Sequence, residues 1–290
     1  MNAQDLYTET TNRIVKALES SSLPPWRKPW IGGGGFLPLR HNGIPYRGAN
    51  TIILWLEAEA RGFDSSTWMT FAQSKEYGGC VRKGEKSTPI LYCQPIVKRD
   101  TADDGQEGES RFWLTKVYRV FNAQQIDGLP ERYTVKPTHQ LDPSQRIEHA
   151  DAFTRNTGAD VRHLEASAYY RPSGDYINMP AFELFDQPEA YYATLCHELA
   201  HWTGAKHRLD RLNLEKRSRE DYSREEIYAE LAACLVCAQL GIMPPSLDQH
   251  AAYLDHWLQA MKADPKYIFT AAATAQRIVD YLNSFQPQPD

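Results

Sequence analysis

Nothing in this 290-residue sequence places it in or across a membrane. No apolar run approaches the roughly 20 residues that a membrane-spanning helix needs. The first residues, M-N-A-Q-D-L-Y, lack the charged-then-apolar pattern of a secretory signal. We therefore expect a cytoplasmic protein without a membrane partner.

Paired cysteines are also scarce. The five cysteines are an odd, scattered set, and the single C-x-x-C spacing, Cys234 with Cys237, falls inside a predicted helix. This usage indicates a reducing compartment in which the thiols serve as small buried apolar groups. The sequence also lacks internal repeats and the paired carboxylates of a magnesium-dependent polymerase, so it does not support primase chemistry.

Charge is divided unevenly along the chain. Residues 1–125 hold sixteen Lys and Arg against thirteen Asp and Glu, or +3, and the remainder holds sixteen against twenty-four, or −8, which together give the net charge of −5. A chain of this length can form two domains with separate cores. We expect a polyanionic partner to bind the first half.

The strongest motif is H-E-x-x-H at His197, Glu198 and His201, within a helix predicted over 186–206. Histidines four residues apart share one face of a helix, so both imidazoles can reach one cation. The adjacent glutamate can hold a water molecule, as in zinc hydrolases. We expect one Zn²⁺ ion, or another divalent transition metal, bound by both histidines, with Glu198 as general base.

A catalytic zinc site needs a third protein ligand. His207 would complete H-E-x-x-H-x-x-G-x-x-H, the spacing of metzincins. We favour Glu226, on the next predicted helix, with Glu230 on the same face as a hydrogen-bond acceptor for a ligand histidine. Glu225 and Glu230 are further candidates for the ligand, and Glu226 could instead close a capping box with Ser223.

A second group of residues is typical of proteins that bind single-stranded nucleic acid. The segment S-S-L-P-P-W-R-K-P-W combines tryptophans, which can stack on bases, with cations, which can contact phosphates. Burial of both tryptophans in a core is an equally good interpretation. A helix N-terminus near residue 48 and a glycine turn after residue 81 add phosphate-binding candidates. The predicted DNA-binding residues are Trp26, Arg27, Trp30, Tyr46, Arg47, Asn50, Arg82, Lys83, Lys86 and Lys116.

The periodicity of apolar residues predicts an α+β chain of two domains. We place the domain boundary in the Gln- and Pro-rich stretch 122–143, which gives a DNA-binding domain over 1–130 and a metallopeptidase domain over 131–290. The predicted helices are 3–20, 49–61, 68–77, 145–156, 186–206, 223–240, 248–262 and 265–284. The predicted strands are 88–98 and 112–121, which form a long hairpin with an acidic tip, and two short strands about Gly174.

Several stretches together resemble the ArdC-type antirestriction proteins of conjugative plasmids, whose N-terminal domain also occurs in TraC-type primases. The matching stretches are P-Y-R-G-A-N (45–50), W-M-T-F-A-Q (68–73), G-G-C-V-R-K-G-E-K-S-T-P-I (78–90), V-F-N-A-Q-Q-I-D-G-L (120–129), H-E-L-A-H-W-T-G-A-K-H-R-L (197–209) and E-E-I-Y-A-E-L (225–231).

The resemblance implies an N-terminal domain that binds single-stranded DNA and an α-rich, zincin-like metallopeptidase domain similar to SprT-type proteases. It also implies a role in shielding incoming plasmid DNA from host restriction during conjugation. The Glu-x-x-Ala-Glu helix of the family matches Glu226 to Glu230 and favours Glu226 as the third ligand. Two alternatives remain: a DNA-coating protein whose metal is only structural, and a zinc protease with a protein substrate and no nucleic acid partner.

Overall fold

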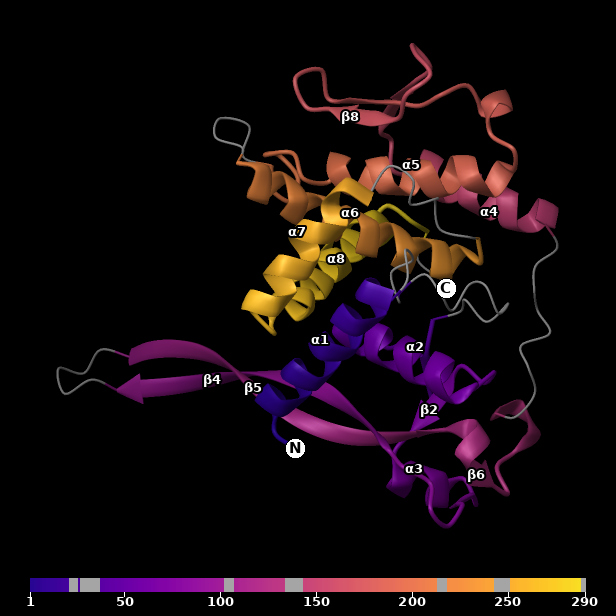
Figure 1. Ribbon diagram of the computed structural model, residues 1–290, viewed down its shortest axis with the longest axis vertical. Helices are drawn as coiled ribbons and strands as arrows, with labels where there is room; N and C mark the ends of the chain where they lie inside the picture. Colours follow the sequence, from indigo (N-terminus) through magenta and orange to yellow (C-terminus); the bar gives the residue numbers. More distant parts are fainter. Residues whose placement is uncertain are drawn as a thin grey trace.

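The computed structural model describes residues 1–20, 26, 37–101, 107–133, 143–212, 218–242 and 251–287. It has two parts, as the sequence predicts: an N-terminal α+β part with a long hairpin, and a C-terminal part made mostly of helices (Figure 1). None of the helices in these ranges combines the length and the apolar character that crossing a bilayer requires.

The N-terminal part is built on a four-stranded sheet with the strand order β1-β2-β5-β4. The predicted hairpin is confirmed and is longer than expected, because β4 and β5 pair from Thr88 opposite Val120 to Thr101 opposite Glu107. A second, two-stranded sheet joins β3 to β6. The elements are α1 (Ala3–Ser20), β1 (Leu39–Arg40), α2 (Ala49–Arg61), β2 (Thr67–Met69), α3 (Phe71–Glu76), β3 (Cys80–Val81), β4 (Thr88–Thr101), β5 (Glu107–Asn122) and β6 (Ile126–Asp127).

The helix predicted over 68–77 is partly wrong. Trp68 and Met69 lie in β2, where they pair with Asn122 and Phe121 of β5. The helix begins only after Thr70, whose side chain forms a capping box with Gln73. A strand of three residues directly before a cap is too short to show an alternating pattern in the sequence.

The C-terminal part places a small sheet beside a group of helices (Figure 1). The two strands predicted about Gly174 are confirmed, and a third strand, which we did not predict, pairs in parallel with the second of them. The elements are α4 (Pro143–Asn156), β7 (Asp160–Arg162), β8 (Tyr169–Arg171), β9 (Tyr176–Asn178), α5 (Pro188–Trp202), α6 (Arg219–Leu240), α7 (Ala251–Ala263) and α8 (Tyr267–Asn283).

The largest apolar core is shared by both parts of the chain. Leu6 and Ile14 of α1 and Trp55 of α2 belong to the same buried cluster as Leu231 of α6 and Trp257 of α7. Two smaller cores, around Trp68 and around Met69, lie within the N-terminal sheet region. The boundary at 130/131 therefore separates sequence segments that bury their apolar surfaces against each other, and it stays a prediction.

The prediction for the cysteines is correct for three of the five. Cys196, Cys234 and Cys237 are buried between α5 and α6, whereas Cys80 and Cys93 are exposed on the N-terminal sheets. All five are free thiols, which agrees with the absence of paired spacings.

Candidate metal centre

The H-E-x-x-H motif lies in the middle of α5, as predicted. The helix is shorter than the expected 186–206, because Gln187 precedes it with extended backbone and Pro188 occupies its first turn. His197 and Glu198 are buried, and His201 is partly buried one turn later. Burial of three polar side chains on one helix is costly unless they interact with one another or with a ligand.

Helix α6 brings Glu226 to these histidines. Its N-terminus is capped by Ser218, whose side chain and that of Asp221 form the capping box. The alternative box between Ser223 and Glu226 is wrong, because Ser223 lies inside the helix. The Glu226 carboxylate is therefore not used as a helix cap, and α6 presents it to α5.

The donor atoms of the three side chains converge on one point. The two Nε2 atoms of His197 and His201 are 3.1 Å apart. Of the Glu226 carboxylate oxygens, Oε2 lies 3.6 Å from the His197 nitrogen and Oε1 lies 3.6 Å from the His201 nitrogen. A tetrahedral ion with bonds of about 2.0–2.1 Å holds its ligands about 3.3 Å apart, so these residues fit a zinc-type ion without rearrangement.

Negative charge surrounds His201. Burial lowers its pKa, but the carboxylates of Glu226, Glu225 and Glu198 raise it more strongly, to about 9. An environment that stabilises a proton on an imidazole also stabilises a metal cation at the same place. The two imidazoles and one carboxylate form the only group of this kind that could hold an ion among the described residues.

Two residues beside His201 were misjudged from the sequence: Glu225 was considered only as a ligand, and Arg211 was not considered at all. Nδ1 of His201 faces Glu225 Oε1 at 3.5 Å, and the same oxygen accepts a hydrogen bond from Arg211 at 2.8 Å. Arg211 also donates to the carbonyl oxygen of Ala200 and to the Thr203 hydroxyl. Burial raises the pKa of Glu225, but the contacts with His201 and Arg211 outweigh it and the net shift is downward. We therefore expect Glu225 to orient a ligand rather than to bind the ion itself.

The alternative third ligand, His207, is not part of the centre. Its side chain is 64% exposed and lies 3.3 Å from Asp175, on the turn between β8 and β9. Glu230 is fully buried one turn after Glu226 and accepts a weak hydrogen bond from the Cys234 thiol. Its expected contact with a ligand histidine stays a prediction.

Three of the predicted DNA-binding residues have structural roles instead. Trp26 is fully buried against Trp257, so its faces are not open to a base. Tyr46 is buried in the core of the N-terminal sheet. The side-chain amide of Asn50 donates to the carbonyl of Leu91 and accepts from the N–H of Leu91. These two bonds pair backbone groups of Leu91 on the edge strand β4. Arg27 and Trp30 lie outside the described residues.

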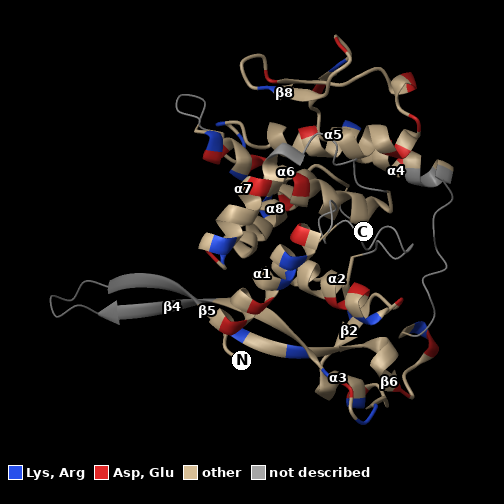
Figure 2. Cartoon of the chain, viewed as in Figure 1, with Lys and Arg blue, Asp and Glu red and all other residues tan. Residues whose placement is uncertain are grey.

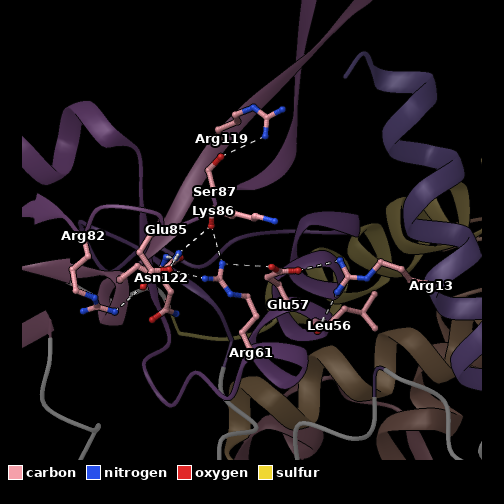
Figure 3. A network of polar contacts seen from close by, with 11 residues as sticks. Arg13, Leu56, Glu57, Arg61, Arg82, Glu85, Lys86, Ser87, Arg119 and Asn122 are labelled. Atoms are coloured by element: carbon pink, nitrogen blue, oxygen red, sulfur yellow. Dashed lines mark hydrogen bonds and ion pairs between the residues drawn. The ribbon is translucent and has the colours of Figure 1, made fainter.

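The remaining cations are on the surface but differ in how they are held. Arg47 pairs with Asp280 of α8. Arg82 pairs with Glu85 and Asp127. Arg61 of α2 also pairs with Glu85, at 2.7 Å, so Glu85 is held by both Arg61 and Arg82 (Figure 3).

The three lysines of the predicted set, Lys83, Lys86 and Lys116, are all exposed. Lys116 lies on β5 opposite Tyr92 of β4, and blue segments mark the cations of the described part of β5 in Figure 2. Tyr92 and Tyr118 are 47% and 44% exposed, and their rings meet edge to face at 5.3 Å. The outer face of the hairpin therefore offers two aromatic rings beside a cation, of which we had predicted only Lys116 as a DNA contact.

Comparisons with known proteins agree with the geometry. Residues 4–121 match the N-terminal domain of the anti-restriction factor ArdC, and residues 148–274 match a zincin-like metallopeptidase family. Protein y4eC of Sinorhizobium fredii is 36% identical over 97% of this chain and 92% of its own length. The DNA primase TraC of Escherichia coli is 36% identical over 97% of this chain, which spans 27% of that primase.

Solved structures show the same relationship. The metal-free crystal structure of the antirestriction protein ArdC from plasmid R388 has a TM-score of 0.81 and 44% identity, and the match covers 97% of both chains. Its Mn(II)-bound structure has a TM-score of 0.78 and 43% identity. The resemblance seen in the sequence is confirmed. The chain belongs to the ArdC family of anti-restriction proteins and carries a zincin-like metallopeptidase domain in its C-terminal part.

Proposed function

We propose that this protein binds single-stranded DNA, protects incoming conjugative plasmid DNA from host restriction, and carries a zinc-dependent peptidase. The observation that carries the enzymatic half is the convergence of His197, His201 and Glu226, whose side-chain nitrogen and oxygen atoms lie 3.1–3.6 Å apart. Mn(II) is the metal in the related ArdC structure. The donor set of two imidazoles and one carboxylate also suits zinc, and leaves a fourth position for water.

His197, His201 and Glu226 would hold the ion, while Glu225 and Arg211 fix the orientation of the His201 ring. A zinc ion bound there would lower the pKa of a water molecule and polarise a peptide carbonyl. Glu198 is the general base in this proposal, since it is buried beside His197 on α5 and adds negative charge around His201. It would take a proton from the attacking water and deliver it to the leaving amine.

The small C-terminal sheet gives the substrate a place to bind. β9 is its central strand, which leaves β8 at one edge, and β8 also lies against α5. A free strand edge pairs with an extended peptide through backbone hydrogen bonds, which requires no particular side chain. We therefore infer a protein substrate that binds in an extended conformation along β8.

The DNA-binding half is supported by the family and by the hairpin surface. The relatives include an anti-restriction protein and a DNA primase, both named for work on DNA. Tyr92 and Tyr118 can each stack on a base, and Lys116, opposite Tyr92 in the hairpin, can contact a phosphate. Lys83 and Lys86 extend the cationic surface toward the turn before β4.

One alternative also has structural support. The metal centre ties α5 to α6 inside the largest core, so an ion there could serve folding alone while protection comes from DNA coating. The second alternative, a protease without a nucleic acid partner, predicts no binding of single-stranded DNA even at low salt.

Glu198→Ala separates these functions. If the peptidase serves protection, this variant binds zinc as the wild type does but cleaves no peptide and fails to protect plasmid DNA in a conjugation assay. Retained protection would support the coating alternative. Full peptide cleavage by the variant would contradict the role of Glu198.

A further inference from the structure

The metal ligand Glu226 contacts a tyrosine that the mechanism above does not use. Tyr222 precedes Glu226 by one turn of α6, so the two side chains lie on the same face of that helix. Burial and the Glu226 charge both raise the pKa of Tyr222, which agrees with a phenol that lies close to this carboxylate. A donor to a ligand carboxylate restricts the orientation of that ligand.

The Tyr222 ring is the last of four aromatic rings in contact. It lies 5.7 Å from the ring of Tyr253 on α7, and Tyr253 stacks on Trp257 at 6.4 Å with an interplanar angle of 24°. Trp257 lies 6.3 Å from Trp26. The indole N–H of Trp257 also donates to the carbonyl of Ser223 in the first turns of α6, which fixes α7 against the start of that helix.

Trp26, the ring at the other end of this row of four, belongs to the N-terminal half. Trp26 is fully buried, although its neighbours in the sequence include prolines and cations. Helix α1 also contacts the end of α7, because Glu19 pairs with Lys262 at 2.7 Å. Thr11 of α1 donates to the carbonyl of Pro265 at 2.7 Å, in the connection that follows α7. Helix α7, which carries the two middle rings, is therefore held between the N-terminal half and the metal-bearing helix.

We propose that the N-terminal half sets the position of Glu226 through the rings of Trp26, Trp257, Tyr253 and Tyr222, so that the metal affinity of the centre depends on Trp26. The inference rests on the proposed metal centre and adds a means of regulating it. A partner that displaces Trp26 from α7 removes support from Tyr222 and weakens metal binding. Tyr222 is a positioning residue in this account, since it acts through a ligand.

A double-mutant cycle on zinc affinity tests this coupling, because residues in one contact network give non-additive effects and independent residues do not. The full-length apoproteins are titrated with Zn²⁺ against a chromophoric competitor, and their unfolding temperatures are recorded without metal. Tyr222→Phe should weaken zinc binding about tenfold, as is usual for a partner of a metal ligand. Trp26→Leu should weaken it severalfold in the wild-type background and have no further effect in the Tyr222→Phe background.

Trp68→Leu is the matched control. Trp68 is as buried as Trp26 and also belongs to the N-terminal half, but it lies in a separate core. This variant should lose thermal stability without losing zinc affinity. If Trp26→Leu does not fold, Tyr253→Leu, at a partly exposed position in the middle of the row, replaces it in the same cycle.

The outcomes separate this inference from the proposed function. A wild-type protein that takes up no zinc overturns both. The coupling alone is overturned if the protein binds zinc but the loss of affinity in the double variant equals the product of the two single losses. It is also overturned if Trp68→Leu weakens zinc binding as much as Trp26→Leu does. A coupled cycle in a protein that cleaves no peptide supports the inference and counts against the peptidase.

Discussion

His201 Nδ1 lies 3.5 Å from Glu225 Oε1 across the contact between α5 and α6. This carboxylate is held in place by Arg211, whose remaining donors bind the C-terminal end of α5. Helix α6 thus supplies two adjacent glutamates with different tasks. Glu226 faces the metal position and Glu225 faces the outer nitrogen of a ligand.

Glu225→Gln should lower metal affinity about 10- to 100-fold, because an amide is a weaker acceptor for the ligand imidazole. It should also destabilise the apoprotein, since Arg211 loses a buried charged partner. Glu220→Gln is the control, because Glu220 lies on the same helix but is 78% exposed. Competition titration with Zn²⁺ measures the effect, and equal affinity in both variants would contradict the role of Glu225.

Removal of the metal should lower the free energy of unfolding. A ligand that binds only the folded state stabilises it by about 2.7 kcal/mol when its free concentration is 100 times Kd. We expect a thermal midpoint that rises with added Zn²⁺ and falls when a chelator is present. In the His201→Ala variant, added Zn²⁺ should leave the midpoint unchanged.

Tyr118→Ala should weaken binding of single-stranded DNA, since the loss of one base-stacking contact costs about 1–3 kcal/mol. Phe71→Ala provides the comparison, because Phe71 is 49% exposed in the same half of the chain but lies off the hairpin. Fluorescence anisotropy with a labelled oligonucleotide reports the affinities. Similar losses for both variants would argue against a stacking surface on the hairpin.

Lys116→Ala tests the electrostatic part of the same surface. Removal of one phosphate contact should reduce the slope of log K against log salt by about 0.7 for a single strand. The affinity should fall by a similar factor for different base sequences, since phosphate contacts carry no sequence information. An unchanged salt slope would show that Lys116 does not contact the DNA backbone.

Asp175 gives a prediction for pH dependence. The hydrogen bonds from Arg208 hold the pKa of Asp175 below its ordinary value of 3.8, although burial acts in the opposite direction. A depressed pKa contributes stability at pH values above 3.8, and this contribution is lost as the pH falls through the folded-state pKa. Asp175→Asn tolerates the left-handed backbone at this position, where φ is 49°. Its stability deficit should be present at pH 6 and shrink toward pH 3 in denaturant titrations.

The centre of the site could be predicted from sequence because its pattern is local. His197 and His201 are related by one turn of a helix, and Glu226 lies in a run of residues that favour a helix. The hairpin could also be predicted from the sequence, because two apolar stretches flank a polar tip. The spacing of residues along a helix or a strand is a short-range property, so these features can be predicted without knowledge of the tertiary structure.

The misassigned residues depend on distant partners. Trp26 lies in a proline-rich stretch with cations, where stacking on bases and burial in a core are equally good interpretations, and Trp257, 231 positions later, buries it. Asn50 reads as a phosphate contact at a helix start, and its true partner is the backbone of Leu91. Arg211 lies in a loop, where no periodicity marks it as a neighbour of Glu225. Each of these roles is set by tertiary contacts, which the spacing of residues within one helix or strand does not show.

The most direct measurement is the metal content of protein that has been purified without any chelator. Elemental analysis should find one zinc per chain in the wild type and in His207→Ala, and none in Glu226→Ala. Protein that is empty and cannot take up added zinc would contradict the metal centre. Full zinc content in Glu226→Ala, together with its loss in His207→Ala, would show that the third ligand has been misassigned.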